Sequence, residues 1–217
     1  MTTALIDWRD GGVPVSRRFD DPYFSLSGGL EESRHVFLAG NGLPGRLRPG
    51  FRIAELGFGT GLNLLAVMEL DPPPLTFTSF ELEPLPVEVA RRAHLAFPAL
   101  AGASEALLAV WDRLDRGPVR LGSVTLDLRP GDARETLPAW DGRADAWFLD
   151  GFSPAKNPEL WGDELMRLVA ERTEAGGTLA TYTAAGHVRR ALAAAGFEVE
   201  RRPGYGRKRH MTRARRT

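Results

Sequence analysis

Apolar residues follow two patterns along this chain, and the pattern changes near residue 51. Short, nearly continuous apolar runs predict strands at residues 52–56, 75–81, 124–128, 144–149 and 178–182. Segments with apolar residues at helical spacing alternate with these runs and predict helices at 62–70, 85–96, 106–114, 159–173 and 188–194. This alternation is typical of an α/β domain with a parallel sheet covered on both faces.

The two ends of the chain depart from this alternation. Residues 6–8 and 13–16 predict an N-terminal β-hairpin, and residues 30–38 have helical spacing. Near the other end, residues 197–201 and 209–213 predict two strands with no helix between them, so the last strand is expected to be antiparallel. We therefore expect an N-terminal hairpin and helix extension over residues 1–50 and a main domain over residues 51–217.

Composition narrows the class of protein. The 217 residues are 43% hydrophobic and 26% charged, which is typical of one soluble globular domain. No apolar run reaches the roughly 18 residues of a membrane span, and the first residues do not resemble a signal peptide, so we expect a cytoplasmic protein. There is no cysteine, and the four histidines show no ligand spacing, so no metal is expected.

Charge is distributed unevenly although the formal net charge is zero. From Arg201 to Thr217 the chain has eight of its 28 Lys and Arg residues and no acidic residue. The other residues therefore have 20 basic and 28 acidic side chains, a net charge of −8. A basic segment on an acidic body is consistent with a surface for a polyanion, and equally with a solvated tail.

A glycine-rich turn joins the first strand of the main domain to its first helix. The stretch ELGFGTGLN, residues 55–63, places Gly57, Gly59 and Gly61 where bare backbone and free helix N–H groups can face a ligand. Leu62 stands where a dinucleotide-binding motif would have its last glycine, which disfavours NAD or FAD. No triphosphate-binding motif is present either.

Acidic residues follow two further strands at the same predicted sheet edge. Glu81 lies about 20 residues after the turn, where a carboxylate can bind a ribose diol, although a capping or surface acid would look the same. Asp132 can reach an adenine amino group, or cap the helix that begins at Ala133. Together with the turn they predict one crevice suited to a nucleoside without phosphates.

These strings, with FLDGFSPAKNP at residues 148–158, resemble those of the tRNA 5-aminomethyl-2-thiouridine methyltransferase family. The likeness also includes PVSRRFDDPYFS, GLEESRHVFL and the C-terminal GGTLATYTAAGHVRRALAAAGFEVERRPGYGRKRHM, so it covers nearly the whole chain. It implies a class I S-adenosylmethionine-dependent methyltransferase fold, Rossmann-like, with a seven-stranded, mostly parallel sheet and an antiparallel last strand. It also implies N-methylation of the 5-aminomethyl group of the tRNA wobble uridine, with the anticodon loop as partner.

The residue pattern and the resemblance together predict roles for individual residues. The expected cofactor contacts are Glu55, Gly57, Phe58, Gly59, Gly61, Asn63, Glu81, Asp132, Ala133 and Asp150. The expected tRNA contacts are Phe24, Phe152, Lys156, Tyr182, Arg207 and Lys208, with Phe152 as the preferred stacking partner of the base. Lys156 is expected to meet phosphate or to cap the pocket, and Arg207 and Lys208 are expected to follow the phosphates of the anticodon stem. Many family members also contain a flavin-dependent oxidoreductase, for which 217 residues leave no room, so a stand-alone methyltransferase is expected.

Methyl transfer to an amine needs a neutral nitrogen held in line with the donor and shielded from water. Asp150 follows an apolar strand and is expected to hold the amine and accept its proton. A carboxylate also stabilises the ammonium, so positioning with proton acceptance is favoured over strong base catalysis, and a purely loop-capping role stays open. Alternative functions are methylation of a small-molecule amine, or a non-catalytic RNA-binding module with a nucleoside pocket.

Overall fold

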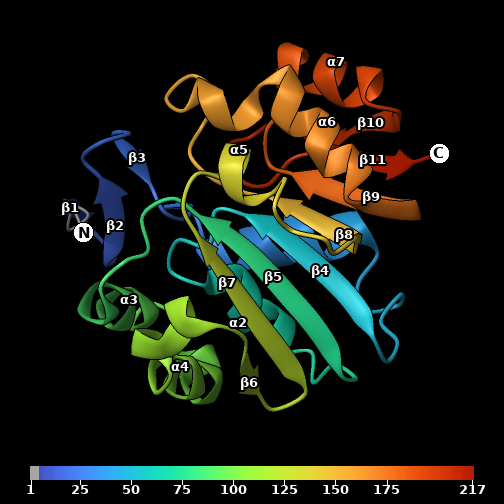
Figure 1. The fold of residues 1–217 in the computed structure, drawn as a ribbon. Helices are drawn as coiled ribbons and strands as arrows, with labels where there is room; N and C mark the ends of the chain where they lie inside the picture. The colour runs from blue at the N-terminus through green and yellow to red at the C-terminus, as the bar shows by residue number, and fades with distance from the viewer. Residues whose placement is uncertain (1–4) are drawn as a thin grey trace.

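The computed structural model describes residues 5–217 and has a central sheet between two layers of helices (Figure 1). Its strands are β1 (Ile6–Arg9), β2 (Val13–Ser16), β3 (Asp21–Pro22), β4 (Phe51–Leu56), β5 (Leu75–Glu81), β6 (Val119–Leu121), β7 (Val124–Pro130), β8 (Ala144–Leu149), β9 (Thr173–Thr181), β10 (Phe197–Pro203) and β11 (His210–Arg216). The first three form a small antiparallel sheet, so the predicted N-terminal hairpin is confirmed.

The large sheet has eight strands in the order β10-β11-β9-β8-β4-β5-β7-β6. Neighbours from β9 to β7 run parallel, which confirms the predicted α/β class. The expected count of seven strands is wrong, because β6 pairs with β7 through a tight turn at Gly122. The last strand is antiparallel as predicted, but β11 is inserted between β9 and β10 and does not form the sheet edge.

The α-helices are α1 (Gly29–Glu32), α2 (Leu62–Met68), α3 (Val87–His94), α4 (Ala101–Leu108), α5 (Ala133–Thr136), α6 (Asp163–Glu171) and α7 (Gly186–Ala194). A π-helix, η1 (Ser33–Leu38), continues directly from α1. The helix predicted over residues 159–173 is shorter than expected. Gly162 has extended backbone and separates a 3₁₀ turn, η5 (Pro158–Trp161), from α6, and Thr173 already belongs to β9.

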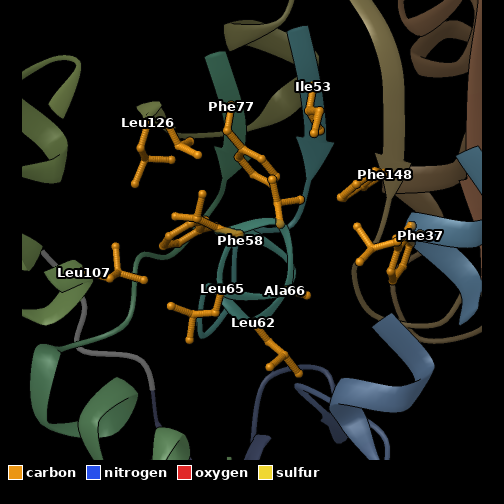
Figure 2. Close-up of a cluster of buried hydrophobic side chains, with 14 of the residues drawn as sticks. Phe37, Ile53, Phe58, Leu62, Leu65, Ala66, Phe77, Leu107, Leu126 and Phe148 are labelled. Carbon is orange, nitrogen blue, oxygen red and sulfur yellow. The ribbon is translucent and has the colours of Figure 1, made fainter. Parts of the chain in front are cut away.

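Two hydrophobic clusters hold the layers together. On one face, Leu65 and Ala66 of α2 belong to the same buried cluster as Ile53 and Phe77 of the sheet, and Leu62 of the same helix points away from these strands (Figure 2). On the other face, α6 and α7 cover a cluster that includes Trp147 and Leu179 (Figure 1). Burial of strands on both faces explains their continuous apolar sequences, and it leaves the carboxyl ends of the strands as the edge where polar loops meet.

The helix over residues 101–108 begins earlier than the sequence pattern indicated. The predicted segment 106–114 is divided between α4 and a 3₁₀ helix, η4 (Trp111–Arg116). The buried Trp111 donates its indole N–H to the carbonyl of Leu85 at 2.8 Å, which holds the second segment against the loop before α3. A tertiary contact therefore decides where the helix ends.

Candidate active site

A cavity of about 890 Å³ opens at the carboxyl ends of β4, β5, β7 and β8. Its wall includes all but two of the expected contact residues: Phe24, Gly57, Phe58, Gly59, Asn63, Glu81, Asp132, Ala133, Asp150, Phe152, Lys156, Tyr182, Arg207 and Lys208. The two exceptions are Glu55 and Gly61. Strand ends that are far apart in the sequence thus meet around one space.

The glycine turn brings bare backbone to the cavity. Gly57 has φ +86°, and a Cβ at this position would lie 3.1 Å from the backbone oxygen of Asp150 and from the Cα of Gly151. The turn and the loop after β8 are therefore in contact. Gly61 also has positive φ, but a Cβ there would lie 2.9 Å from Leu107, so this glycine serves the packing of α2 beneath the cavity.

Glu81 closes the turn from the end of β5. Its carboxylate accepts the backbone N–H of Gly59 at 2.9 Å and that of Glu83 at 2.8 Å. Burial raises the pKa of Glu81, while these backbone N–H groups favour its charged form. The carboxylate is thus held rigidly on the cavity wall, where its remaining lone pairs can accept hydrogen bonds from a diol.

Asp132 both caps a helix and faces the cavity, the two roles that its sequence position allows. It is the N-cap of α5 and accepts the backbone N–H of Arg134 at 2.9 Å, and it also lies on the cavity wall. The guanidinium of Arg134 lies 2.6 Å from its Oδ2 and holds the pKa of this carboxyl below its usual range. Asp132 therefore remains ionised at the mouth of the cavity.

A buried hydrogen-bond chain connects the turn to Asp150. The side-chain amide of Asn63, on α2, donates to Glu55 Oε1 at 2.9 Å and to Asp150 Oδ2 at 2.8 Å. Glu55 also accepts from the hydroxyl of Ser79 at 2.7 Å, and burial raises its pKa to about 8. The structure therefore places Glu55 one layer beneath the cavity, where its oxygens contact Asn63 and Ser79.

Asp150 follows β8 and is partly buried. Its second oxygen accepts the backbone N–H of Gly151 at 2.8 Å, so both oxygens are oriented. Burial raises the pKa of Asp150 to about 6, and the negative charge of Glu32 adds to the increase. A carboxylate with this pKa is largely ionised at neutral pH and can still take up a proton.

Aromatic side chains form another part of the wall. The ring of Phe152 stacks on Phe19 with centroids 4.7 Å apart and meets the edge of Tyr23 at 5.0 Å. Phe24 packs edge-on against Phe97, also at 5.0 Å. Trp161, at the end of η5, is 2% exposed and donates its indole N–H to the carbonyl of Phe152. It therefore supports the loop after β8 from beneath.

The N-terminal extension fastens the loop after β8. Asp21 accepts the backbone N–H of Ser153 at 2.7 Å, and the ammonium of Lys156 lies 3.1 Å from Asp20 Oδ2 and 3.7 Å from Asp21 Oδ1. The sequence predicts that Lys156 meets phosphate or caps the pocket. In the structure the ammonium of Lys156 instead pairs with these two aspartates, so Lys156 connects the loop after β8 to the N-terminal extension.

The hairpin between β10 and β11 reaches the cavity from the opposite end of the chain. Arg207 is exposed on the cavity rim. The ammonium of Lys208 turns inward, 2.8 Å from Glu32 Oε1 and 4.0 Å from the ring centroid of Tyr182. The position of Lys208 therefore favours contacts with Glu32 and Tyr182 over the expected contact with phosphate.

Sequence reasoning missed several residues of the wall, above all Glu32, Ser33 and Arg18. Glu32 and Ser33 belong to a segment with ordinary helical spacing, and Arg18 lies between the hairpin and an aromatic loop. Only the packing of the extension against α2 and β8 brings them to the site. All three lie within PVSRRFDDPYFS and GLEESRHVFL, strings that are part of the family likeness, but the spacing of residues in these strings did not mark them as site residues.

Neither a metal-binding group of side chains nor a membrane-spanning helix is found in the described part of the chain. Among residues 5–217 no group of three or more His, Asp or Glu side chains is arranged to hold a metal ion. No helix in that range combines the length and apolar character required to cross a membrane.

A comparison with protein-family models assigns the fold and its cofactor. The model described as S-adenosyl-L-methionine-dependent methyltransferase matches residues 98–217. The chain belongs to this family. Its cofactor is accordingly S-adenosylmethionine, and the crevice expected for a nucleoside without phosphates agrees with this methyltransferase assignment.

The methyltransferase has curated relatives that are longer than itself. It is 48% identical over 219 residues to the tRNA 5-methylaminomethyl-2-thiouridine biosynthesis bifunctional protein MnmC of Caulobacter vibrioides, covering 95% of this chain and 37% of the relative. The protein of the same name from a second Caulobacter species is 45% identical, with 98% and 38% covered. The methyltransferase thus spans little more than a third of these relatives.

Solved structures resemble the methyltransferase over most of its length. MNMC2 from Aquifex aeolicus has a TM-score of 0.77 and 27% identity, covering 99% of this chain and 70% of that chain. TrmN from Thermus thermophilus has a TM-score of 0.56 and 20% identity, covering 94% and 54%, and supports the fold alone. The methyltransferase fold predicted from sequence is therefore confirmed.

Proposed function

We propose that this methyltransferase transfers a methyl group to the primary amine of 5-aminomethyl-2-thiouridine, or 5-aminomethyluridine, at the wobble position of tRNA. One observation supports this most strongly: Asp150 lies where an acidic, glycine-lined edge of the cavity meets an aromatic edge. The relatives named for 5-methylaminomethyl-2-thiouridine biosynthesis support the choice of acceptor. The product would be the 5-methylaminomethyl nucleoside.

The acidic, glycine-lined edge fits S-adenosylmethionine. Gly57 and Gly59 present backbone without side chains, and Glu81 is a buried carboxylate with capacity to accept from a ribose diol. Asp132 is an ionised acceptor at the mouth, suited to an adenine amino group. When bound, the cofactor supplies an electrophilic methyl group on a sulfonium. We assign the remaining contacts to Phe58, Asn63 and Ala133, which share this wall.

Asp150 would act on the acceptor amine. An alkylammonium is mostly protonated at neutral pH and has no free lone pair until it loses a proton. Asp150, held by Asn63 and the Gly151 N–H, can hydrogen-bond the nitrogen, fix its direction and take the proton directly or through water. Its raised pKa reduces the cost of accepting that proton. We therefore assign it positioning together with proton acceptance.

The aromatic edge suits a flipped pyrimidine. A base from a single-stranded anticodon loop can be splayed out at modest cost and stacked on aromatic rings. Phe152 is held between Phe19 and Tyr23, and we propose it as the stacking partner, with Phe24 and Tyr182 alongside. The exposed Arg207 on the rim is placed to meet phosphate of the anticodon stem-loop.

The decisive experiment measures transfer of labelled methyl from S-adenosylmethionine to three acceptors. These are tRNA with the unmethylated aminomethyl group, the same tRNA without the aminomethyl group, and a mixture of small primary amines. Label confined to the first acceptor supports the proposal, and nucleoside mass analysis should find it on the wobble uridine. Label on the small amines instead would indicate a small-molecule methyltransferase, and tRNA binding without any transfer would indicate a non-catalytic module.

A further inference from the structure

Glu32 is a buried carboxylate on the cavity wall to which neither the cofactor nor the acceptor contacts described above assign a role. It ends α1, is 8% exposed, and lies on the wall of the cavity. Removing a carboxylate from water costs free energy unless a cation or several donors compensate. Its charged partner is the ammonium of Lys208, 2.8 Å away, which reaches in from the β10–β11 hairpin.

The same ammonium makes a second contact that is specific for cations. Lys208 Nζ lies 4.0 Å from the ring centroid of Tyr182. The Tyr182 hydroxyl donates to the carbonyl of Gly151 at 2.7 Å, and the ring meets Trp161 edge-on, so its orientation is set from both ends. An ammonium above a fixed aromatic face gains electrostatic attraction from the ring quadrupole.

A second carboxylate faces this region. Ser33, which follows Glu32, donates to Asn63, and Asn63 donates to Asp150, while the Tyr182 hydroxyl donates to the carbonyl of Gly151, so the three groups line one stretch of the cavity wall. Two carboxylates and an aromatic face, converging from α1, β8 and β9, are the chemistry that selects an alkylammonium over a neutral group. The ammonium of Lys208 already occupies the part of this site formed by Glu32 and Tyr182.

We propose that Glu32, Asp150 and the ring of Tyr182 form a subsite for the primary ammonium of the acceptor, and that Lys208 occupies its Glu32 side as an internal competitor. This inference rests on the proposed function, which supplies the acceptor. The Lys208 side chain is 41% exposed, so it can turn to solvent when another ammonium replaces it. Glu32 then selects the charged aminomethyl group, while Asp150 holds its nitrogen toward the donor.

The substitution Glu32→Gln tests the subsite because it keeps the shape and removes the charge. The matched control is Glu31→Gln, the neighbouring and exposed acid, which is not on the cavity wall. With aminomethyl tRNA as acceptor, Glu32→Gln should raise KM about tenfold or more, since hydrogen bonds to charged groups are among the stronger ones. Its kcat and its Kd for S-adenosylmethionine should stay within about threefold of wild type.

The competitor role of Lys208 makes the opposite prediction. Lys208→Met should leave KM unchanged or lower it, because the internal ammonium is removed. If Lys208 instead binds phosphate, the same substitution raises KM. A rise in KM for Lys208→Met, an unchanged KM for Glu32→Gln, or a matching loss of cofactor affinity in Glu32→Gln would each overturn the proposal.

A binding measurement separates this inference from the proposed function. Titration calorimetry with 5-aminomethyluridine and the neutral 5-hydroxymethyluridine, in the presence of S-adenosylhomocysteine, requires no turnover. Wild type and Glu31→Gln should prefer the amine, and Glu32→Gln should lose that preference. Equal affinity of wild type for both nucleosides, including binding too weak to detect, contradicts the subsite. Preference for the amine without methyl transfer to tRNA would contradict the proposed function alone.

Discussion

Asn63 Nδ2 lies 2.8 Å from Asp150 Oδ2 and donates a hydrogen bond to it across the base of the cavity. The same nitrogen donates to the buried Glu55, so the position of Asp150 depends on a side chain of α2 and on a carboxylate in β4. The residue proposed to meet the amine is therefore oriented by the glycine-turn region that is proposed to meet the cofactor. This coupling makes several consequences measurable.

Asp150→Asn should lower methyl transfer to aminomethyl tRNA about a hundredfold or more, because the amide cannot accept the amine proton. Affinity for S-adenosylmethionine should change little, since the amide keeps the shape of the carboxylate. Single-turnover assays and cofactor titration measure the two quantities. Asp141→Asn, at an exposed position outside the cavity wall, is the matched control. Turnover at the wild-type rate would remove Asp150 from the mechanism.

Asn63→Leu should shift the acidic limb of the pH–rate profile to higher pH. The Asn63 hydrogen bond favours ionised Asp150, whose pKa is about 6, so its loss raises that pKa. A larger fraction of Asp150 is then protonated at pH 7, and activity should recover partly at higher pH. A profile that superimposes on wild type after scaling would mean that Asn63 does not tune Asp150.

Glu55 makes the stability of the fold depend on pH. Burial raises its pKa from 4.5 to about 8, so between these values the folded chain holds a proton that the unfolded chain has released. The contribution of Glu55 to the free energy of unfolding is therefore fully present below pH 4.5 and is lost as pH rises through 8. The loss is on the order of a few kcal/mol.

The substitution Glu55→Gln should remove this loss. Its carbonyl can accept from Asn63, and its amide can donate to the oxygen of Ser79 once the Ser79 hydroxyl, which donates to Glu55 in the structure, rotates. Urea unfolding of both proteins at pH 5, 7 and 9 should show curves that diverge with rising pH, with the variant more stable at pH 9. Parallel pH dependences would show that Glu55 titrates normally in the folded protein.

Gly57→Ala should weaken cofactor binding tenfold or more. Alanine at φ +86° costs about 1–2 kcal/mol, and its Cβ would press on the backbone of Asp150 at 3.1 Å. Gly50→Ala is the matched control, because Gly50 has φ +78° with open space around it and so should lose stability alone. Equal cofactor affinities for the two variants would argue against a cofactor contact at the turn.

Arg207→Ala should raise the KM for tRNA several-fold. It should also reduce the slope of log KM against log salt concentration by about one, the change expected for the loss of one phosphate contact. Affinity for S-adenosylmethionine should not change. Arg116→Ala, which removes another exposed arginine away from the cavity wall, controls for total charge. A KM that responds equally to both substitutions would indicate non-specific attraction instead of a contact on the rim.

The order of strands and helices was accessible from the sequence because burial on both faces makes each strand a continuous apolar run. The acidic and glycine positions at strand ends could be placed together for the same reason, since parallel strands end at one edge. Helix ends were less accessible. The break at Gly162 and the divided segment around Trp111 depend on backbone geometry and tertiary contacts that a residue pattern does not encode.

The sequence by itself determined the α/β architecture, the edge that holds the cavity, and the residues Gly57, Glu81, Asp132 and Asp150 on its wall. The tertiary structure alone decided which charges face one another. It paired Lys156 with Asp20 and turned Lys208 toward Glu32, over more than a hundred intervening residues in each case. Periodicity reports whether a residue is buried, whereas the partner of a buried or half-buried charge depends on how distant segments pack.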